Sequence, residues 1–193
     1  MPLNLPKLTR QGYDTSTPQR AMSALMAYVA KRPQAPLQAL ANAIPLDMSD
    51  HQLAHFVGQA CHESESFRFL RELWGPTPTQ LAYEGRRDLG NTEPGDGFKY
   101  RGRGIFQITG RANYSHMAKV LNLPLVEHPE LLEMPDHAVA SALAFWDGHG
   151  LSGISANSDV RAACELITRR INGGSNGLDD RLQLTQKAFS VLS

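Results

Sequence analysis

The sequence carries no net charge and few cysteines. Its 193 residues include 19 Lys and Arg against 19 Asp and Glu, so the formal net charge is zero. Domains that bind nucleic acid usually have a basic excess, and we therefore expect no nucleic-acid partner. The two cysteines, Cys61 and Cys164, lie far apart in apolar, helix-like contexts. We expect two buried thiols rather than a zinc site or a disulfide framework.

The chain also lacks long apolar runs. No stretch approaches the roughly 18 apolar residues that span a membrane, and the first 20 residues contain no apolar core of the kind found in signal peptides. We therefore expect a protein that is held in the cytoplasm and does not insert stably into a membrane. Hydrophobic residues make up 41% of the chain and charged residues 20%. This composition is typical of a globular protein, and we expect one domain over residues 1–193 and a monomer.

Apolar residues at helical spacing account for most of the chain. Pro18 begins one predicted helix, over 18–32, and Ser49 or Asp50 can cap another, over 50–64. Further helices are expected within 33–48 and over 111–123, 134–150, 158–174 and 179–192. The segment GIFQIT, residues 104–109, is predicted to be extended, and it follows a long irregular insert rich in Gly, Pro and charge, residues 75–104. The predicted fold class is mostly α.

The stretch GQACHESESF, residues 58–67, places an acid on an otherwise apolar helix. At about 100° per residue, Glu63 lies at the seam between the apolar and polar faces, near the helix C-terminus. An apolar wall and the negative end of a helix both disfavour an ionised carboxylate. Glu63 is therefore suited to carry a proton as a general acid. The alternative is an ordinary solvated surface Glu.

Three histidines share one stripe of the same helix: His51, His55 and His62. They lack the HExxH spacing, and seven residues of helix separate His55 from His62 by about 10 Å. We therefore expect polar contacts along the helix, no metal site and no cofactor.

A second motif is GDGFKYRGRGIFQITGRANY, residues 95–114, in which glycines alternate with aromatic and cationic residues. Glycine lets a backbone approach a ligand closely. No GxxxxGK[ST] phosphate loop is present. Along an extended segment Gln107 and Thr109 point to the same side, where two neutral hydrogen-bonding groups suit a water or a sugar hydroxyl. A polar strand face is the alternative. Further on, Asn172 before two glycines is typical of a helix C-cap, although its amide could also reach a sugar N-acetyl group.

Together these motifs resemble the family 19 glycoside hydrolases, chitinase-like enzymes of the lysozyme superfamily, and especially their short phage-type endolysins. The matching text is GQACHESESF, GDGFKYRGRGIFQITGRANY, INGG and the following Arg181. Where the family often has HESGGF or HETGG, this chain has HESESF, so the turn after Glu63 is less rich in glycine. The resemblance implies a lysozyme/chitinase-like α+β fold with a minimal extended element and two helical lobes that flank a substrate cleft. A helical segment, 1–48, would precede a catalytic core, 49–185.

The resemblance also implies roles for individual residues in an inverting hydrolysis of β-1,4 bonds between N-acetylated sugars. Glu63 would be the general acid, Thr109 would help to hold the attacking water, and Arg181 would orient a carboxylate. The residues expected to bind substrate are His62, Tyr100, Gln107, Asn113, Tyr114, Asn172 and Arg181.

The general base must be a second carboxylate, because inverting enzymes use two carboxyl groups roughly 6.5–9.5 Å apart. Glu65 would point away from Glu63 on a continuous helix. Glu72 can serve only if the helix ends near 64–67 and the chain doubles back. Phage-type relatives have a Glu at this spacing, so Glu72 is the predicted base. The alternatives are Glu84, Glu93 and Asp96.

Two polymers share the expected bond, chitin and peptidoglycan, and peptidoglycan adds a lactyl-peptide on alternate sugars. The absence of a secretion signal and of a chitin-binding module in a compact chain favours peptidoglycan. We therefore predict an endolysin held in the cytoplasm of the producing bacterium, which degrades the wall in the periplasm after release by a holin-type protein. The alternatives are a chitinase, a lytic transglycosylase, which uses one acid and forms a 1,6-anhydro sugar, and a non-catalytic wall-binding protein.

Overall fold

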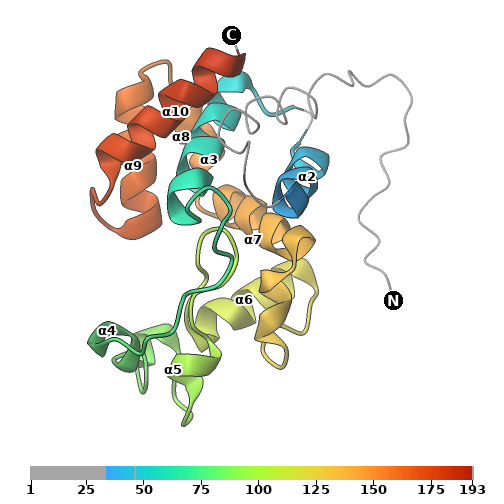
Figure 1. Ribbon diagram of the computed structural model, residues 1–193, viewed down its shortest axis with the longest axis vertical. Helices are drawn as coiled ribbons and strands as arrows, with labels where there is room; N and C mark the ends of the chain where they lie inside the picture. The colour runs from blue at the N-terminus through green and yellow to red at the C-terminus, as the bar shows by residue number, and fades with distance from the viewer. Residues whose placement is uncertain (1–33, 46, 193) are drawn as a thin grey trace.

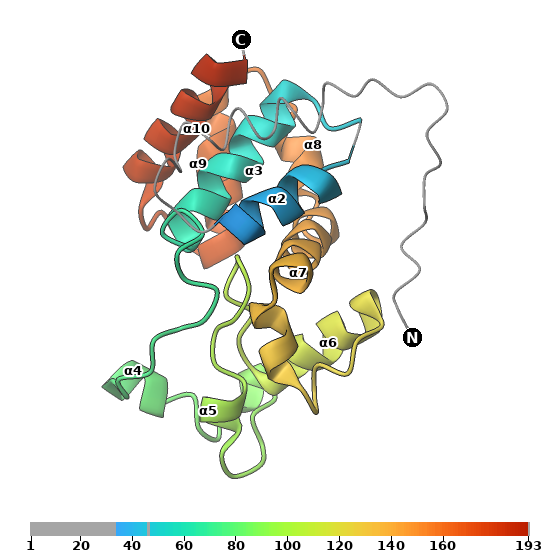
Figure 2. The ribbon, with the colours of Figure 1, turned by 45° about the vertical axis from the view of Figure 1, so that its right-hand side comes forward.

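The computed structural model describes residues 34–45 and 47–192, and its helices form two lobes (Figures 1 and 2). The upper lobe contains α2 (Gln34–Ala43), α3 (Asp50–Glu63), α8 (Leu151–Ser155), α9 (Val160–Asn172) and α10 (Leu178–Leu192). The lower lobe contains α4 (Pro78–Leu81), η1 (Arg87–Leu89), α5 (Asp96–Lys99) and α6 (Arg111–Leu121). The two lobes are joined by η2 (Pro129–Glu133) and α7 (Pro135–Gly148).

This architecture confirms a mostly α fold with two helical lobes. The helices expected after residue 49 appear within a few residues of their predicted ends, and the insert 75–104 contains the three short helices α4, η1 and α5. The helix predicted over 18–32 lies outside the described residues. The division into 1–48 and 49–185, and a cleft between the lobes, stay predictions. Among the described residues, no helix is long and apolar enough to cross a membrane.

Each lobe has its own apolar core. The upper core surrounds Phe56 of α3 and Trp146 of α7, whose rings pack edge to face at 5.2 Å. The lower core gathers buried side chains around Tyr100 and Tyr114. Phe145 of α7 packs against both cores, so α7 is the apolar connection between the lobes.

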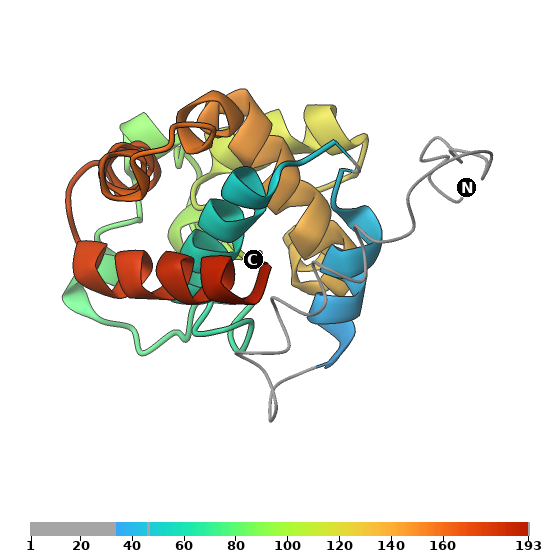
Figure 3. The same cartoon turned by 90° about the horizontal axis from the view of Figure 1, so that it is seen from above.

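Helix α3 begins at a capping box. The Ser49 hydroxyl accepts a hydrogen bond from the Gln52 backbone, and the Gln52 side chain accepts one from the Ser49 backbone, which satisfies two amide groups at the helix start. Every residue of α3 from Leu53 to Cys61 is buried. The sequence alone leaves one side of this helix polar, but α10 packs across that side (Figure 3). Cys61 and Cys164 are both buried and free, as predicted.

The packing of α10 on α3 depends on Gly58. A methyl group at this position would lie 2.2 Å from Thr185 Oγ1 and 2.9 Å from Thr185 Cα. We expect Gly58→Ala to lower the free energy of unfolding by about 1–3 kcal/mol, because overpacking at this contact outweighs the better helix propensity of Ala. Urea unfolding would measure the change. Gly153→Ala is the matched control, since a methyl group at Gly153 would meet no atom within 4 Å. Equal stability of the two variants would contradict this account.

A turn with left-handed backbone follows directly after α3. The helix ends at Glu63, and Glu65, Ser66 and Phe67 follow with φ angles of 47°, 57° and 65°. Left-handed conformations are unfavourable for residues with side chains, and glycine is the residue that adopts them freely. The replacement of Gly-Gly by Glu-Ser therefore strains this turn, while the buried ring of Phe67 and a bond from its backbone N–H to the Ser64 hydroxyl hold it. The helix therefore ends where it must end if Glu72 is to act as the base, and a turn follows it directly.

The prediction of an extended segment over 104–109 is wrong for most of its length. Residues 104–107 form a turn, in which Gly104 and Gln107 have φ angles of 76° and 50°. In the described part of the chain, the extended pairing consists of isolated bridges from Arg103 to Arg71 and to Ile108. Because two left-handed residues interrupt the backbone, strict strand alternation does not set the directions of Gln107 and Thr109.

Candidate active site

Glu63, the predicted general acid, ends α3 and is paired with a cation from α10. Arg181 Nη2 donates a hydrogen bond to Glu63 Oε1 at 2.6 Å. The Glu63 side chain is 18% exposed, while Arg181 is buried. Arg181 was expected to orient a carboxylate, and the carboxylate that it contacts is Glu63; the orienting role stays a prediction. Because Arg181 is buried, we do not retain it as a residue that contacts substrate directly.

Arg181 is itself held by the surrounding helices. Its Nη1 donates to Gln59 Oε1 at 2.6 Å, and its Nε donates to the Asn176 carbonyl at 3.1 Å. Gln59 Nε2 in turn donates to Thr168 Oγ1 at 3.3 Å. Gln59 was not among the residues predicted from the sequence, although it lies one helical turn before Glu63. A buried guanidinium therefore lies against the Glu63 carboxylate, a partner that the sequence pattern did not indicate.

Glu72, the predicted general base, lies on the segment that follows the left-handed turn at 65–67. Its Oε1 accepts hydrogen bonds from Gln80 Nε2 at 3.0 Å and from the Tyr83 hydroxyl at 3.4 Å. Its Oε2 accepts a bond from the Gly102 backbone N–H at 3.1 Å. Burial and the nearby Glu72 carboxylate raise the pKa of Tyr83, so this phenol keeps its proton and acts as a donor. Gln80 and Tyr83 belong to the insert whose function the sequence left open.

Two of the alternative bases hold the loop around α5. Asp96 is buried, accepts bonds from the backbone of Thr92 and Glu93, and pairs with Arg111 at 2.5 Å. The bond from Arg111 lowers the pKa of Asp96. Glu84 accepts bonds from the N–H groups of Gly95 and Gly97. Glu93 is exposed. Through these contacts Asp96 and Glu84 hold the backbone around α5 in place. Glu72 stays the predicted base.

Gln107, Thr109 and Asn113 form a connected set beside Glu72. A methyl group at Gly102 would lie 2.7 Å from Gln107 Oε1 and 3.4 Å from Glu72 Cβ, so the glycine lets both side chains approach. The Thr109 hydroxyl donates to the Gln107 carbonyl at 2.9 Å, and Asn113 Nδ2 donates to the Thr109 carbonyl at 2.7 Å. Gln107 and Thr109 are half-buried and Asn113 is exposed, so each retains surface that a ligand can contact.

The structure contradicts the predicted substrate contacts of Tyr100 and Tyr114. Both side chains are 0% exposed and belong to the lower core. The Tyr100 hydroxyl donates to the Val126 carbonyl, and the Tyr114 hydroxyl donates to the Arg101 carbonyl and accepts a bond from Arg103. The family resemblance implied contacts with substrate, but both rings pack into the lower core.

His62 and Asn172 organise the connection between α9 and α10. His62 Nδ1 lies 2.5 Å from Asp180 Oδ2, and its ring occupies space that a side chain at Gly177 would fill. Asn172 accepts a bond from the Gly174 N–H and donates one to the Asn176 carbonyl, and Gly173 is the left-handed C-cap of α9. Contacts of His62 and Asn172 with a sugar stay predictions.

The other histidines of the stripe do not converge on His62. His51 and His55 both pack edge to face against Phe189 of α10. Over residues 34–45 and 47–192, no group of three or more His, Cys, Asp or Glu side chains could hold a metal ion.

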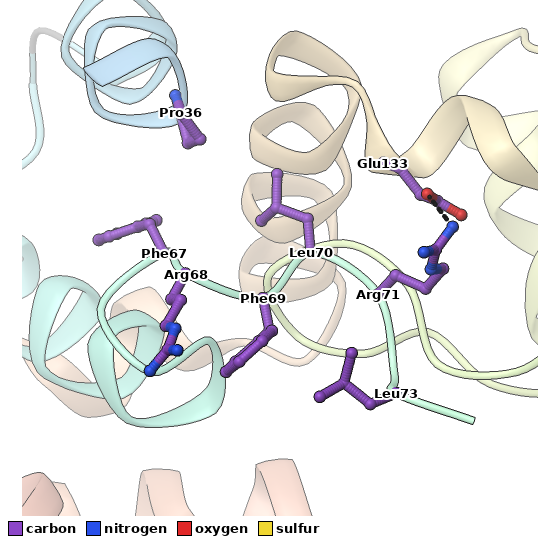
Figure 4. Close-up of a pocket in the computed structure, with 8 residues that line it drawn as sticks. All are labelled: Pro36, Phe67, Arg68, Phe69, Leu70, Arg71, Leu73 and Glu133. Carbon is purple, nitrogen blue, oxygen red and sulfur yellow. Dashed lines mark hydrogen bonds and ion pairs between the residues drawn. The ribbon is translucent and has the colours of Figure 1, made fainter. Parts of the chain in front are cut away.

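A pocket of about 290 Å³ is lined by residues on either side of Glu72, while Glu63 and Glu72 are not among its lining residues (Figure 4). Its lining includes Arg71, Leu73 and Glu133, and Figure 4 shows Arg71 turned toward Glu133, with which it pairs at 3.1 Å. Neighbouring side chains of an extended segment point to opposite faces. Since Arg71 and Leu73 flank Glu72, this pocket is separate from the carboxylates and is not the candidate site.

Comparison with known proteins gave no matching family model but several similar chains. A glycosyl hydrolase family 19 domain-containing protein of Haemophilus influenzae is 34% identical over 160 residues, which cover 69% of this chain and 76% of that protein. An endochitinase of Arabidopsis thaliana is 31% identical over 137 residues, which cover 66% of this chain and 41% of the endochitinase.

Two crystal structures share the fold. Chitinase C from Streptomyces griseus superposes with a TM-score of 0.58 at 20% identity, covering 95% of this chain and 71% of that one. A class IV chitinase from Zea mays has a TM-score of 0.56 at 18% identity, covering 96% and 87%.

Proposed function

Because the chain belongs to glycosyl hydrolase family 19 and is a chitinase-like glycosidase, we propose that it is a peptidoglycan-degrading endolysin. In this proposal it cleaves β-1,4 bonds between N-acetylated amino sugars by inverting hydrolysis. The observation that carries the proposal is a pair of carboxylates with different partners. Glu63 is bound by a guanidinium, and Glu72 is bound by an amide, a phenol and a backbone N–H. Inverting hydrolysis needs two carboxyl groups in different roles.

The contacts of each group suit its role. Protonated Glu63 donates its proton to the glycosidic oxygen and is left as a carboxylate, whose charge Arg181 stabilises. Glu72 accepts a proton from the water that attacks the anomeric carbon on the opposite face. The Thr109 hydroxyl uses its hydrogen in the bond to the Gln107 carbonyl, so its lone pairs are available to accept a bond from that water.

The resemblance of the motifs GQACHESESF and GDGFKYRGRGIFQITGRANY to those of the short phage-type endolysins supports peptidoglycan as the proposed substrate. The proposal places the enzyme in the cytoplasm of the producing bacterium as a monomer. A holin-type release factor would give it access to the glycan strands in the periplasm.

Chitin hydrolysis is the second candidate, favoured by the names of the plant relatives and of the structures with the same fold. Zymography of the purified protein separates the two substrates. We expect clearing of gels that contain purified murein and little clearing of gels that contain colloidal chitin. Activity on chitin alone would overturn the choice of peptidoglycan.

The products distinguish hydrolysis from transglycosylation. Inverting hydrolysis of a β bond releases a reducing end that is initially the α anomer, whereas a transglycosylase leaves a 1,6-anhydro sugar. Mass spectrometry of digested murein, with ¹H NMR of the first anomer formed, would test the bond and the mechanism together.

A further inference from the structure

The side-chain amide of Gln80 makes hydrogen bonds through all of its donor and acceptor positions, and one of its partners is Glu72. Gln80 is 5% exposed. Its Nε2 donates to Glu72 Oε1 at 3.0 Å and to the Leu73 carbonyl at 2.8 Å. Its Oε1 accepts from the backbone N–H groups of Gly75 at 3.0 Å and Thr77 at 2.9 Å. A glutamine amide offers two donors and two acceptor positions, and all four are occupied.

This arrangement determines which end of the amide faces the carboxylate. Exchanging the amide oxygen and nitrogen would place an NH₂ group against two backbone N–H donors and an oxygen against Glu72 and a carbonyl. The group that faces Glu72 is therefore a donor. The bond from the Thr77 backbone N–H to the Gln80 oxygen is one half of the capping box that begins α4, and it does not need the Thr77 side chain.

Among the described residues, the hydrogen-bond partners of Glu72 leave one position on its carboxylate free. An ionised carboxylate has about four lone-pair positions. Gln80 and Tyr83 occupy Oε1, and the Gly102 N–H occupies one position of Oε2. A general base needs a fixed carboxylate with a lone pair that can receive the proton of the attacking water.

We infer that Gln80 is a positioning residue, which holds the Glu72 carboxylate in the orientation that its role as general base requires. This inference rests on the proposed function, because it assigns to Glu72 the proton transfer from water. Gln80 acts through Glu72 and does not touch the substrate.

Gln80→Glu is the sharpest test, because it changes one atom. The new carboxylate can still accept the bonds from Gly75 and Thr77, but the donor that faces Glu72 becomes an acceptor. Two adjacent carboxylates resist ionising together. We expect the acid limb of the kcat/KM profile to move to higher pH, with KM for soluble glycan fragments changed less than twofold. A ¹³C NMR titration of the glutamate side-chain carboxyls gives the same readout without turnover.

Gln80→Leu removes the donor without adding charge. We expect kcat to fall about tenfold, the equivalent of about 1.4 kcal/mol of barrier, with KM nearly unchanged. Thr77→Ala is the matched control, because it removes the other half of the same capping box, the hydroxyl that accepts from the Gln80 N–H, without touching Glu72. Thr77→Ala is expected to keep kcat within twofold and the pH profile of the wild type. Thermal unfolding of each variant separates loss of fold from loss of orientation.

The outcomes distinguish this inference from the proposed function. A wild-type protein that degrades neither murein nor chitin would overturn the proposed function. A different set of results would overturn the role of Gln80 alone. In that set the wild type is active and Glu72→Gln is inactive, but Gln80→Glu keeps the wild-type pH profile and kcat. If Gln80→Leu does not fold, the pH profile and titration of Gln80→Glu still decide the question.

Discussion

Replacing Glu63 with Gln is expected to lower kcat by about 10²–10⁴-fold, the usual contribution of a general acid. Gln cannot donate the proton that Glu63 is proposed to transfer to the glycosidic oxygen. The fold is expected to survive, because the amide oxygen of Gln can still accept the bond from Arg181. Steady-state kinetics on solubilised murein, with circular dichroism and thermal unfolding, would measure both effects.

Glu65→Gln is the matched control for this substitution. Glu65 lies two residues further on, is exposed, and has a long contact of 3.9 Å with Arg68. Its loss should leave kcat unchanged. A Glu63→Gln variant that retains wild-type turnover would remove Glu63 from the mechanism. Retained binding of sacculi by an inactive Glu63→Gln variant would separate catalysis from substrate recognition.

The protein is expected to lose stability below neutral pH because of His55. This side chain is fully buried, and neither ring nitrogen has a hydrogen-bond partner among the described residues. Burial and the neighbouring His51 lower the pKa of His55 from its ordinary value of 6.5 to about 4. Between these two values the unfolded chain binds a proton that the folded protein does not. The free energy of unfolding should therefore fall as the pH decreases from 6.5 to 4, by about 3 kcal/mol in total.

Urea unfolding at several pH values between 7 and 4 would measure this loss. His55→Leu removes the titrating group and should flatten the dependence on pH over that range. His128→Gln is the control, because His128 is an exposed histidine whose side chain is 61% accessible, and the variant should keep the wild-type dependence. An unchanged slope in His55→Leu would show that another group accounts for the acid sensitivity.

Much of the local structure could be predicted from the sequence because it depends on neighbours in the chain. The cap at Ser49, the end of α3 near Glu63 and the glycine C-cap of α9 each follow from residues within a few positions. The candidate acid was also found locally, since its helix position sets it between an apolar and a polar face. The same local logic predicted a strand over 104–109, where two left-handed residues make a turn instead.

The partners of the two carboxylates could not be predicted in the same way. Arg181 is 118 residues from Glu63, and no periodicity indicates that its guanidinium reaches Gln59 as well. Gln80 is closer to Glu72 in sequence, but its contact depends on a loop whose hydrogen bonds are irregular.

The sequence by itself therefore determined the helices, the end of α3 near Glu63 and the family motifs, because backbone propensities and side-chain periodicity act over a few residues. Only the tertiary structure decided that Tyr100 and Tyr114 face a core and that α10 buries the polar side of α3. It also decided that the guanidinium of Arg181 binds Glu63, while neutral donors such as the Gln80 amide bind Glu72. These outcomes depend on which surfaces meet when distant segments pack, and packing joins residues that the linear pattern does not relate.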